Sequence, residues 1–343
     1  MKTSSRPSRN NKTVAPGFVT GMLAGARKQQ FDLQPLLGDI GIDLADQDRR
    51  IPLDLYATLY NRLIHELNDE GFALFSRPVL PGSFEFLCRS VSTAPHLAEA
   101  LNRAGRYLQI VLPDLAVNIE ITEQMAYLCL RENQPLSTER NDPARIFAFE
   151  WLLRLLHGLS AWLVGRGLAL DHVTFPYDRP DHASDYPLIY TENFSFGSDH
   201  LRASLQLNLL ELPVRRDEAA LAAFLEGAPG KLTTLYRRDR EVVIRVRDLL
   251  RKAFPESPGQ EEIAARLYLS PRTLHRRLAD EGSSFRAIKD ALRRDMALSR
   301  LSKTDEPVAR IAAELGYADT STFYRACMEW TGLPPSSYRR QRR

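Results

Sequence analysis

The sequence has few cysteines, no long apolar run and no secretory leader. Three cysteines, Cys88, Cys129 and Cys327, lie far apart, and an odd number without metal-ligand spacing favours a reducing compartment over a disulfide framework. Arg154 and Arg166 interrupt the most apolar stretch, so no segment reaches the ~18 consecutive apolar residues of a membrane helix. Residues 1–13 are basic and polar with no apolar segment behind them, which excludes a signal peptide. A cytoplasmic protein with no membrane contact is predicted.

The sequence also lacks the common catalytic signatures. It contains no G-x-S-x-G, G-x-x-x-x-G-K-[ST], G-x-G-x-x-G or H-E-x-x-H, which would mark nucleophile elbows, nucleotide-binding loops and zinc proteases. His172 and His182 are too far apart for a structural metal site, and Asp178–Asp181 are typical turn formers. The prediction is a protein that is not an enzyme and that has no catalytic residues, no metal and no cofactor.

Length and charge indicate two domains. A chain of 343 residues exceeds the usual size of one hydrophobic core. Residues 241–343 carry 20 Lys and Arg against 14 Asp and Glu, whereas residues 1–240 are slightly acidic. A basic segment beside an acidic one is typical of a nucleic-acid-binding module carried by another domain. We expect a disordered leader at 1–15, a first domain at 16–214, a linker at 215–234 broken at Gly227–Gly230, and a second domain at 235–343.

The first domain is predicted to be α+β because helical and strand patterns cluster rather than alternate. Helical periods run through 17–29, 52–69, 95–106 and 143–168, and strand patterns through 82–91, 115–121, 125–131, 171–176 and 203–209. The apolar face of 146–163 has two interpretations, a packed core or a dimer surface or pocket wall. The same alternatives hold for Tyr186, Tyr190, Phe194 and Phe196.

The second domain contains an internal repeat. The segment IAARL at 263–267 recurs as IAAEL at 311–315, and Leu274-His275-Arg276 is matched by Phe323-Tyr324-Arg325. Each copy reads as helix, tight turn, helix, so the domain is predicted to be all-α with two helix-turn-helix motifs. Between them, residues 285–302 form a basic amphipathic helix, with Ile288, Leu292 and Met296 on one face, that would join the motifs rigidly.

Turn and cap residues support this division. Ser270 is a good N-cap followed by Pro271, and Gly282 suits a left-handed stop. In the second copy, Pro307 opens the first helix and Gly316 ends it. Asp319 is expected to cap the next helix by accepting the Thr322 N–H, and that helix is expected to run to Gly332.

The second helix of each motif is expected to enter the major groove of DNA. Helical spacing places Arg272, His275 and Arg276 on one exposed face of the first copy, and Thr320, Ser321, Tyr324 and Arg325 on that of the second. Arginine can bind a guanine edge through two hydrogen bonds, and the others can donate or accept along base edges. One such face alone would be an ordinary solvated surface; two capped copies with matched apolar positions indicate DNA binding.

At these residues the chain resembles the AraC/XylS family of bacterial transcription regulators. The matching text is IAARLYLSPRTLHRRLADEGSSF, RRDMALSRL and PVARIAAELGYADTSTFYRACMEWTGLPPSSYR, and the resemblance covers about 236–340. It implies two helix-turn-helix motifs joined by a long helix, with the seven residues named above at the bases. At Cys327-Met328-Glu329, where the family usually has an aromatic and then a basic residue, the chain departs. We therefore expect a thinner core in the second motif, and more of the sequence specificity in the first.

Residues 20–213 resemble the sensor domain of this family, in the branch named after arabinose binding that includes amino-acid and fatty-acid responders. The matching text is PGSFEFLCRSVSTAPHLAEALNRAGRYLQIV and FPYDRPDHASDYPLIYTENFSFGSDHLRASLQLNLLELPV. The resemblance implies a small-molecule effector and a homodimer, with promoter DNA and RNA polymerase as partners in the nucleoid. Two alternatives for this domain stay open: dimerisation without a ligand, and an enzymatic domain placed on DNA by the second domain.

Overall fold

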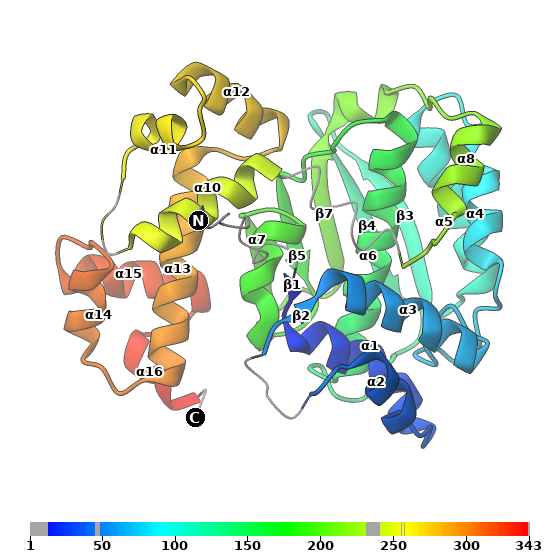
Figure 1. Ribbon diagram of the computed structural model, residues 1–343, viewed down its shortest axis with the longest axis horizontal. Helices are drawn as coiled ribbons and strands as arrows, with labels where there is room; N and C mark the ends of the chain where they lie inside the picture. The colour runs from blue at the N-terminus through cyan, green and yellow to red at the C-terminus, as the bar shows by residue number, and fades with distance from the viewer. Residues whose placement is uncertain (1–12, 45–48, 231–240, 255, 257, 342–343) are drawn as a thin grey trace, which may run out of the picture. The chain divides into compact units, whose positions relative to one another are not determined.

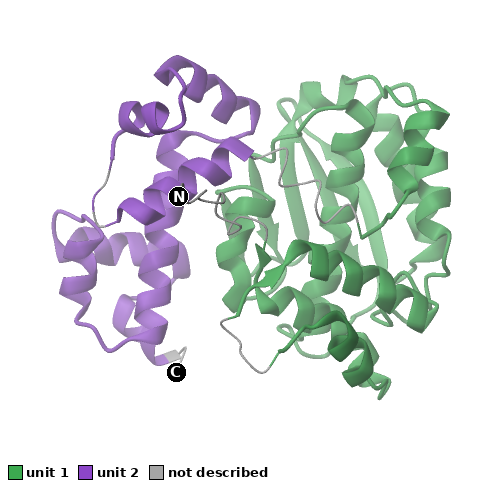
Figure 2. Ribbon diagram, in the orientation of Figure 1, with its two compact units in different colours: residues 1–240 green, residues 241–343 purple. Residues whose placement is uncertain are grey.

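The computed structural model describes residues 13–44, 49–230, 241–254, 256 and 258–341. They fall into two compact units, residues 1–240 and residues 241–343 (Figure 2). We call them the N-terminal unit and the C-terminal unit. Most of the expected leader lies outside the described residues, and its last part, Thr13–Val14, forms a strand.

The N-terminal unit is α+β, as predicted. Its helices are α1 (Pro16–Lys28), α2 (Gln34–Ile40), α3 (Leu53–Leu67), α4 (Ser83–Ser92), α5 (Leu97–Val111), α6 (Pro143–Val164), α7 (Tyr186–Ile189) and α8 (Glu218–Leu225), with short 3-10 helices at Asp181–Asp185 and Leu207–Glu211. Its strands are β1 (Thr13–Val14), β2 (Ile51–Pro52), β3 (Leu115–Ile121), β4 (Met125–Glu132), β5 (His172–Phe175), β6 (Phe194–Phe196) and β7 (Leu201–Gln206).

The main sheet has five strands in the order β3-β4-β7-β5-β6 (Figure 1). All neighbours are antiparallel except β5 and β6, which are parallel. Ala126, Leu128 and Leu130 of β4 are buried on one face, and Cys129 is buried on the other, so most of this strand is covered by other parts of the unit. Helices α5 and α6 pack on each other, α5 lies against β3, and α1 lies along α6.

One predicted strand, at 82–91, is wrong: the segment is helix α4. Phe84, Leu87, Cys88 and Val91 are buried at helical spacing, whereas Phe86 is 67% exposed. The alternation of apolar and polar residues suggested a strand, but the period of 3.6 places all four buried side chains on one face. The prediction followed the wrong period.

The first half of the expected linker also forms a helix. In α8, Leu221 and Phe224 are buried one turn apart. The Phe224 ring stacks on that of Trp162 in α6, with centroids 4.1 Å apart. Residues 218–225 are therefore packed on the N-terminal unit, while residues 231–234 lie outside the described residues.

Helix α6 forms the centre of the N-terminal core. It is long and apolar enough by composition to cross a membrane, but 89% of that stretch is buried inside the unit. A helix that is apolar on all sides is typical of a buried position in a large core. The residues at 146–163 therefore form a packed core within the chain, as do Tyr186, Tyr190 and Phe194, while Phe196 is partly buried against it.

Helix α6 nevertheless carries buried charges. Glu150, which is fully buried, accepts hydrogen bonds at Oε1 from the Tyr186 hydroxyl and from His182 Nε2, the latter at 2.6 Å. One turn later lies Arg154, whose guanidinium carbon is 5.0 Å from the centre of the Phe18 ring. Buried charges are expensive unless they are paired. This cluster consequently places two charged side chains of one helix inside the core.

Candidate DNA-binding interface

The C-terminal unit is all-α, as predicted. Its helices are α10 (Glu241–Ala253), α11 (Gln260–Arg266), α12 (Pro271–Asp280), α13 (Phe285–Lys303), α14 (Val308–Glu314), α15 (Thr320–Thr331) and α16 (Pro335–Gln341). Helices α11 and α12 form the first helix-turn-helix motif, and α14 and α15 the second. Helix α13 joins them and packs against α10, α14 and α16 (Figure 1).

Each motif has its own apolar core. The first contains Ile263, Leu267, Leu274 and Leu278, together with Ile288 and Leu292 of α13. The second contains Ile311, Leu315 and Phe323, with Leu298 and Leu301 from the far end of α13. Because α13 supplies side chains to both cores, it fixes the orientation of the first motif at its N-terminal half and that of the second motif at its C-terminal half.

The predicted caps are present. The Ser270 hydroxyl accepts the Thr273 N–H at 3.1 Å, and Asp319 accepts the Thr322 N–H at 2.7 Å. Gly282, Gly316 and Gly332 are left-handed, with φ of 71°, 76° and 70°. These contacts fix where each recognition helix begins and how each motif turns.

The two turns differ at one equivalent position. Where the second motif has Gly316, the first has Tyr268, with φ of 57° and a side chain that is 94% exposed. A left-handed conformation is unfavourable for a residue with a Cβ atom. Tyr268 is therefore strained and projects into solvent at the turn that precedes the first recognition helix.

The predicted contact residues lie on the outer faces of the two recognition helices. Arg272, His275 and Arg276 are exposed on α12, opposite the buried Leu274 and Leu278. On α15, Ser321, Tyr324 and Arg325 are exposed, and Thr320 is half-buried at the first position of the helix. Arg325 also donates a hydrogen bond from Nη2 to the Thr322 hydroxyl at 3.3 Å. The structure thus groups the seven residues by motif, three on α12 and four on α15.

Cys327, which stands where the family usually has an aromatic residue, lies in the core of the second motif. Cys327 is fully buried beside Phe323. The rings of Tyr317 and Trp330 lie 5.2 and 6.4 Å from that of Phe323. Two aromatic rings accordingly pack around the small thiol, and Met328 and Glu329 face solvent. The second motif keeps an aromatic core despite the missing aromatic residue.

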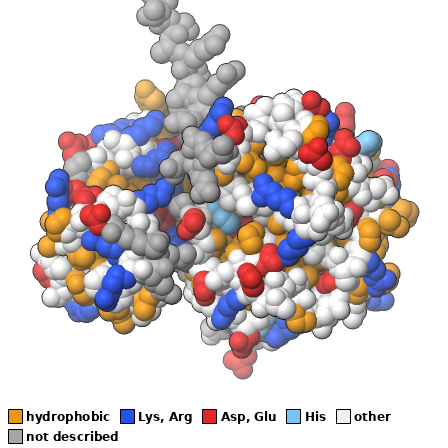
Figure 3. Space-filling model, turned by 90° about the horizontal axis from the view of Figure 1, so that it is seen from below, with side chains coloured by type: hydrophobic (Ala, Val, Ile, Leu, Met, Phe, Trp, Pro, Cys, Tyr) orange, Lys and Arg blue, Asp and Glu red, His pale blue; other side chains and the backbone are white. Residues whose placement is uncertain are grey.

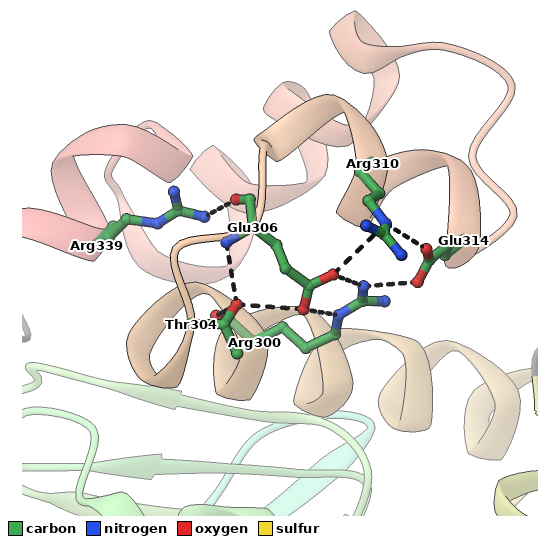
Figure 4. A network of polar contacts seen from close by, with 6 residues as sticks. All are labelled: Arg300, Thr304, Glu306, Arg310, Glu314 and Arg339. Atoms are coloured by element: carbon green, nitrogen blue, oxygen red, sulfur yellow. Dashed lines mark hydrogen bonds and ion pairs between the residues drawn. The ribbon is translucent and has the colours of Figure 1, made fainter.

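An ion-pair network holds the second motif to α13. Arg300 donates from Nε to one oxygen of Glu306 at 3.1 Å and from Nη2 to the other, and also to Glu314 at 2.6 Å (Figure 4). Arg310 binds Glu314 at 2.8 Å, and Arg339 donates to the Glu306 carbonyl oxygen at 2.5 Å. The hydrogen bond from Arg300 lowers the pKa of Glu306, and those from Arg310 and Arg300 lower the pKa of Glu314. These residues connect α13, α14 and α16.

Sequence reasoning missed the role of Arg300. The basic character of residues 285–302 was taken as a property of the helix as a whole, but its basic residues Lys289, Arg293, Arg294 and Arg300 are all half-buried. A signal was available, because Glu306 lies three residues after the end of α13 and Glu314 is the last residue of α14. On the face seen in Figure 3, Lys and Arg are interspersed with Asp and Glu rather than gathered in one patch. Several basic residues therefore hold the fold together instead of facing a partner.

A second connection joins α10 to the first motif. Both oxygens of the Glu281 carboxylate accept backbone hydrogen bonds, from Val242 at 2.9 Å and Val243 at 2.8 Å. Arg247 of α10 also pairs with Asp295 of α13 at 2.7 Å, and both side chains are buried. Helix α10 is thereby fixed to the end of α12 and to the middle of α13.

In the N-terminal unit, Glu120, Cys129 and His200 place possible metal ligands within 4.8 Å of one another. Arg131, however, pairs with Glu120 at 2.5 Å and contacts His200 at 3.2 Å, and Arg202 is 3.4 Å from Glu120. Two guanidinium groups at this place disfavour a metal cation. We interpret the group as an ion-pair network on the polar face of the sheet.

Comparison with known proteins covers both units. Residues 31–214 match the family model described as "Arabinose-binding domain of AraC transcription regulator, N-term", and residues 263–341 match a helix-turn-helix domain. The ornithine utilization regulator of Pseudomonas aeruginosa is 29% identical over 250 residues, 73% of this chain and 72% of that protein. An uncharacterized HTH-type transcriptional regulator of Mycobacterium tuberculosis is 30% identical over 311 residues, 87% of each chain.

Among solved structures, the transcriptional regulator CdpR of Pseudomonas aeruginosa is similar over 98% of this chain and all of that chain, with 19% identity and a TM-score of 0.32. The C-terminal domain of AraT from Geobacillus stearothermophilus is 32% identical, with 29% of this chain and 85% of that chain covered and a TM-score of 0.27. These TM-scores are low, so the relationship is carried by the sequence matches.

Proposed function

The chain belongs to the AraC family of transcription regulators, and we propose that it controls promoters in response to a small molecule bound by its N-terminal unit. Its relatives are transcriptional regulators and not enzymes, so DNA binding is the function of the C-terminal unit. The proposal adds effector control, a homodimer, contact with RNA polymerase and a location in the bacterial cytoplasm at the nucleoid. One relative is named for ornithine utilization, which associates a protein of this type with a small molecule.

One observation supports base recognition. Helices α12 and α15 are each capped and packed on a core of their own, and each exposes a polar face. We propose base contacts by Arg272, His275 and Arg276 in the first motif and by Thr320, Ser321, Tyr324 and Arg325 in the second. The first face carries two arginines and the second carries one. We therefore propose that the first motif contributes more of the sequence specificity.

The test begins with selection of binding sites from randomised duplex DNA by the full chain. Replacement of Arg276 by alanine should then weaken binding to the selected site by about 1–3 kcal/mol if it reads a guanine. Arg251→Ala, an exposed arginine of α10 outside both motifs, is the matched control. Equal affinities for wild type and Arg276→Ala in a mobility-shift titration would remove Arg276 from base recognition.

Effector control is tested separately. A ligand that binds only the folded chain raises its melting temperature, so a thermal-shift screen with amino acids, fatty acids and sugars separates an effector-binding domain from one that only dimerises. Sedimentation equilibrium of the full chain tests the homodimer.

A further inference from the structure

Two neighbouring basic residues of α13, Lys289 and Arg293, differ from the other charged residues of the helix. They are four positions apart and therefore lie on one face. Both are half-buried, yet neither forms a hydrogen bond or an ion pair with any residue that the structure describes. On the same helix, by contrast, Arg300 binds two glutamates and Arg286 pairs with an aspartate. The stability of the C-terminal unit therefore does not explain Lys289 and Arg293.

The surroundings of these two residues make their positive charges costly. Burial and the charge of Arg293 lower the pKa of Lys289, and the attraction of Asp290 does not offset them. Asp290 itself pairs with Arg286 at 3.6 Å. Like charges at this helical spacing repel each other. Two cations held side by side in this way are stabilised most by an anion that approaches both of them.

Arg293 lies against the turn of the second helix-turn-helix motif. A Cβ atom at Gly316 would be 3.3 Å from Arg293 Nη2. Burial raises the pKa of the next residue, Tyr317, to about 12, and the charge of Arg293 acts against this rise. Gly316 comes three residues before Asp319, the cap of α15. Arg293 is therefore close to the start of a recognition helix, where the phosphates that border the major groove are expected.

The two residues also lie between the motifs. Helix α13 has 19 residues, of which Lys289 is the fifth and Arg293 the ninth. Such a helix spans about 28 Å, close to the ~34 Å between successive turns of the major groove. The motifs pack on its two ends (Figure 1). When both recognition helices occupy successive turns of the groove, the sugar–phosphate backbone between these turns passes the middle of α13.

We propose that Lys289 and Arg293 form a phosphate clamp, which binds the DNA backbone between the two major-groove segments and takes no part in base recognition. Phosphate oxygens supply the anion that the two side chains lack within the described residues. The Arg293 guanidinium can bind a phosphate through two parallel hydrogen bonds, and Lys289 acts as a point charge. The inference rests on the proposed binding of both motifs to one duplex.

The salt dependence of DNA binding distinguishes a phosphate contact from a base contact. Each contact with a phosphate contributes about 0.9 to the slope of log affinity against log salt, which is roughly 8-fold in affinity at 0.1 M salt. In anisotropy titrations of the full chain, Lys289→Gln and Arg293→Gln should each reduce the slope by about one. The fold-loss should be equal for the selected site and for a duplex of unrelated sequence, whereas Arg276→Ala should weaken the selected site more.

Two controls test for indirect effects. Arg251→Gln removes an exposed cation of α10 that pairs with Asp248 and should keep the wild-type slope. Lys289→Arg keeps the charge and should bind like wild type. Because Lys289 and Arg293 form no ion pair within the described part of the unit, both glutamine variants should unfold at the wild-type urea concentration or at a higher one, as followed by circular dichroism.

The phosphate clamp is refuted if both glutamine variants keep the wild-type slope, or if their loss of affinity is confined to the selected site. It is also refuted if they unfold at a lower urea concentration, because the two residues would then stabilise the fold. A loss of affinity in Arg276→Ala beside unchanged binding by both glutamine variants would refute the clamp and leave base recognition standing. Failure of the full chain to select any DNA site would refute the proposed function as well.

Discussion

Replacement of Arg300 by glutamine should loosen the second helix-turn-helix motif. Arg300 makes three charge-assisted hydrogen bonds to Glu306 and Glu314, and a glutamine amide could replace one at most. The Arg300 side chain is 18% exposed and its partners are 28% and 39% exposed, so solvent screens each bond. Two lost bonds at somewhat under ~1 kcal/mol each give an expected loss of about 1–2 kcal/mol.

The chain allows this loss to be measured in one motif. It has three tryptophans, and Trp330 alone lies in the C-terminal unit, against Phe323 and Tyr317. In a Trp151→Phe, Trp162→Phe background, Trp330 fluorescence during denaturation reports the second motif. The midpoint should fall in the Arg300→Gln variant, and affinity for the selected DNA site should fall with it because α15 is less firmly held on α13.

Arg310→Gln is the matched control. Arg310 binds the same Glu314 at 2.8 Å but is 67% exposed, so solvent screens this ion pair and its replacement should shift the Trp330 midpoint much less than Arg300→Gln does. If the two variants shift the Trp330 transition equally, or if Arg300→Gln leaves it unchanged, the network does not stabilise the second motif and the reasoning fails.

Three further predictions concern single residues. Tyr268→Gly should stabilise the C-terminal unit by about 1 kcal/mol in urea denaturation because glycine relieves the left-handed strain, whereas Gly316→Ala should destabilise it; a loss in the first would show that the tyrosine ring contributes contacts. Ser270→Ala should cost about 1 kcal/mol by removing the cap of α12, and an unchanged midpoint would show that the cap is not needed. Burial alone would lower the pKa of His182, but the charge and hydrogen bond of Glu150 outweigh it and raise the pKa. The stability that protonated His182 gains beside Glu150 is therefore complete below about pH 6.5 and is lost as the pH rises through the folded-state pKa of His182. Glu150→Gln should flatten this part of the plot of unfolding free energy against pH. An unchanged plot would show that the pair does not contribute to stability.

The C-terminal unit was largely predictable because its signals are local. Ser270 and Asp319 each cap a helix within three residues of themselves, and Gly316 ends a turn by its own backbone freedom. The repeat then indicated which helices form each helix-turn-helix motif, which a single copy of the pattern would not have indicated. Three of the seven proposed base-contact residues follow in turn: His275 and Arg276 are exposed positions between buried Leu274 and Leu278, and Tyr324 is exposed beside buried Phe323.

The N-terminal unit was less predictable because its organisation depends on distant contacts. Strands β3 and β4 show their alternation locally and were found. The segment at α4 satisfies two periods at once, and only packing decides between them. The cluster around Glu150 joins residues more than thirty positions apart, and the hydrogen bond from the Asn61 side chain to the Gly227 carbonyl spans 166 positions. Such contacts cannot be predicted from a local sequence pattern.

The carboxylate of Glu281 has a consequence for how the C-terminal unit responds to tension. Because the first turn of α10 takes its cap from a residue 38–39 positions later in the chain, that turn is complete only when α12 is docked beside it. A pull on the start of α10 therefore acts directly on the end of the first recognition helix. The two helices behave mechanically as one piece, and a signal delivered at residue 241 needs no further hinge to reach α12.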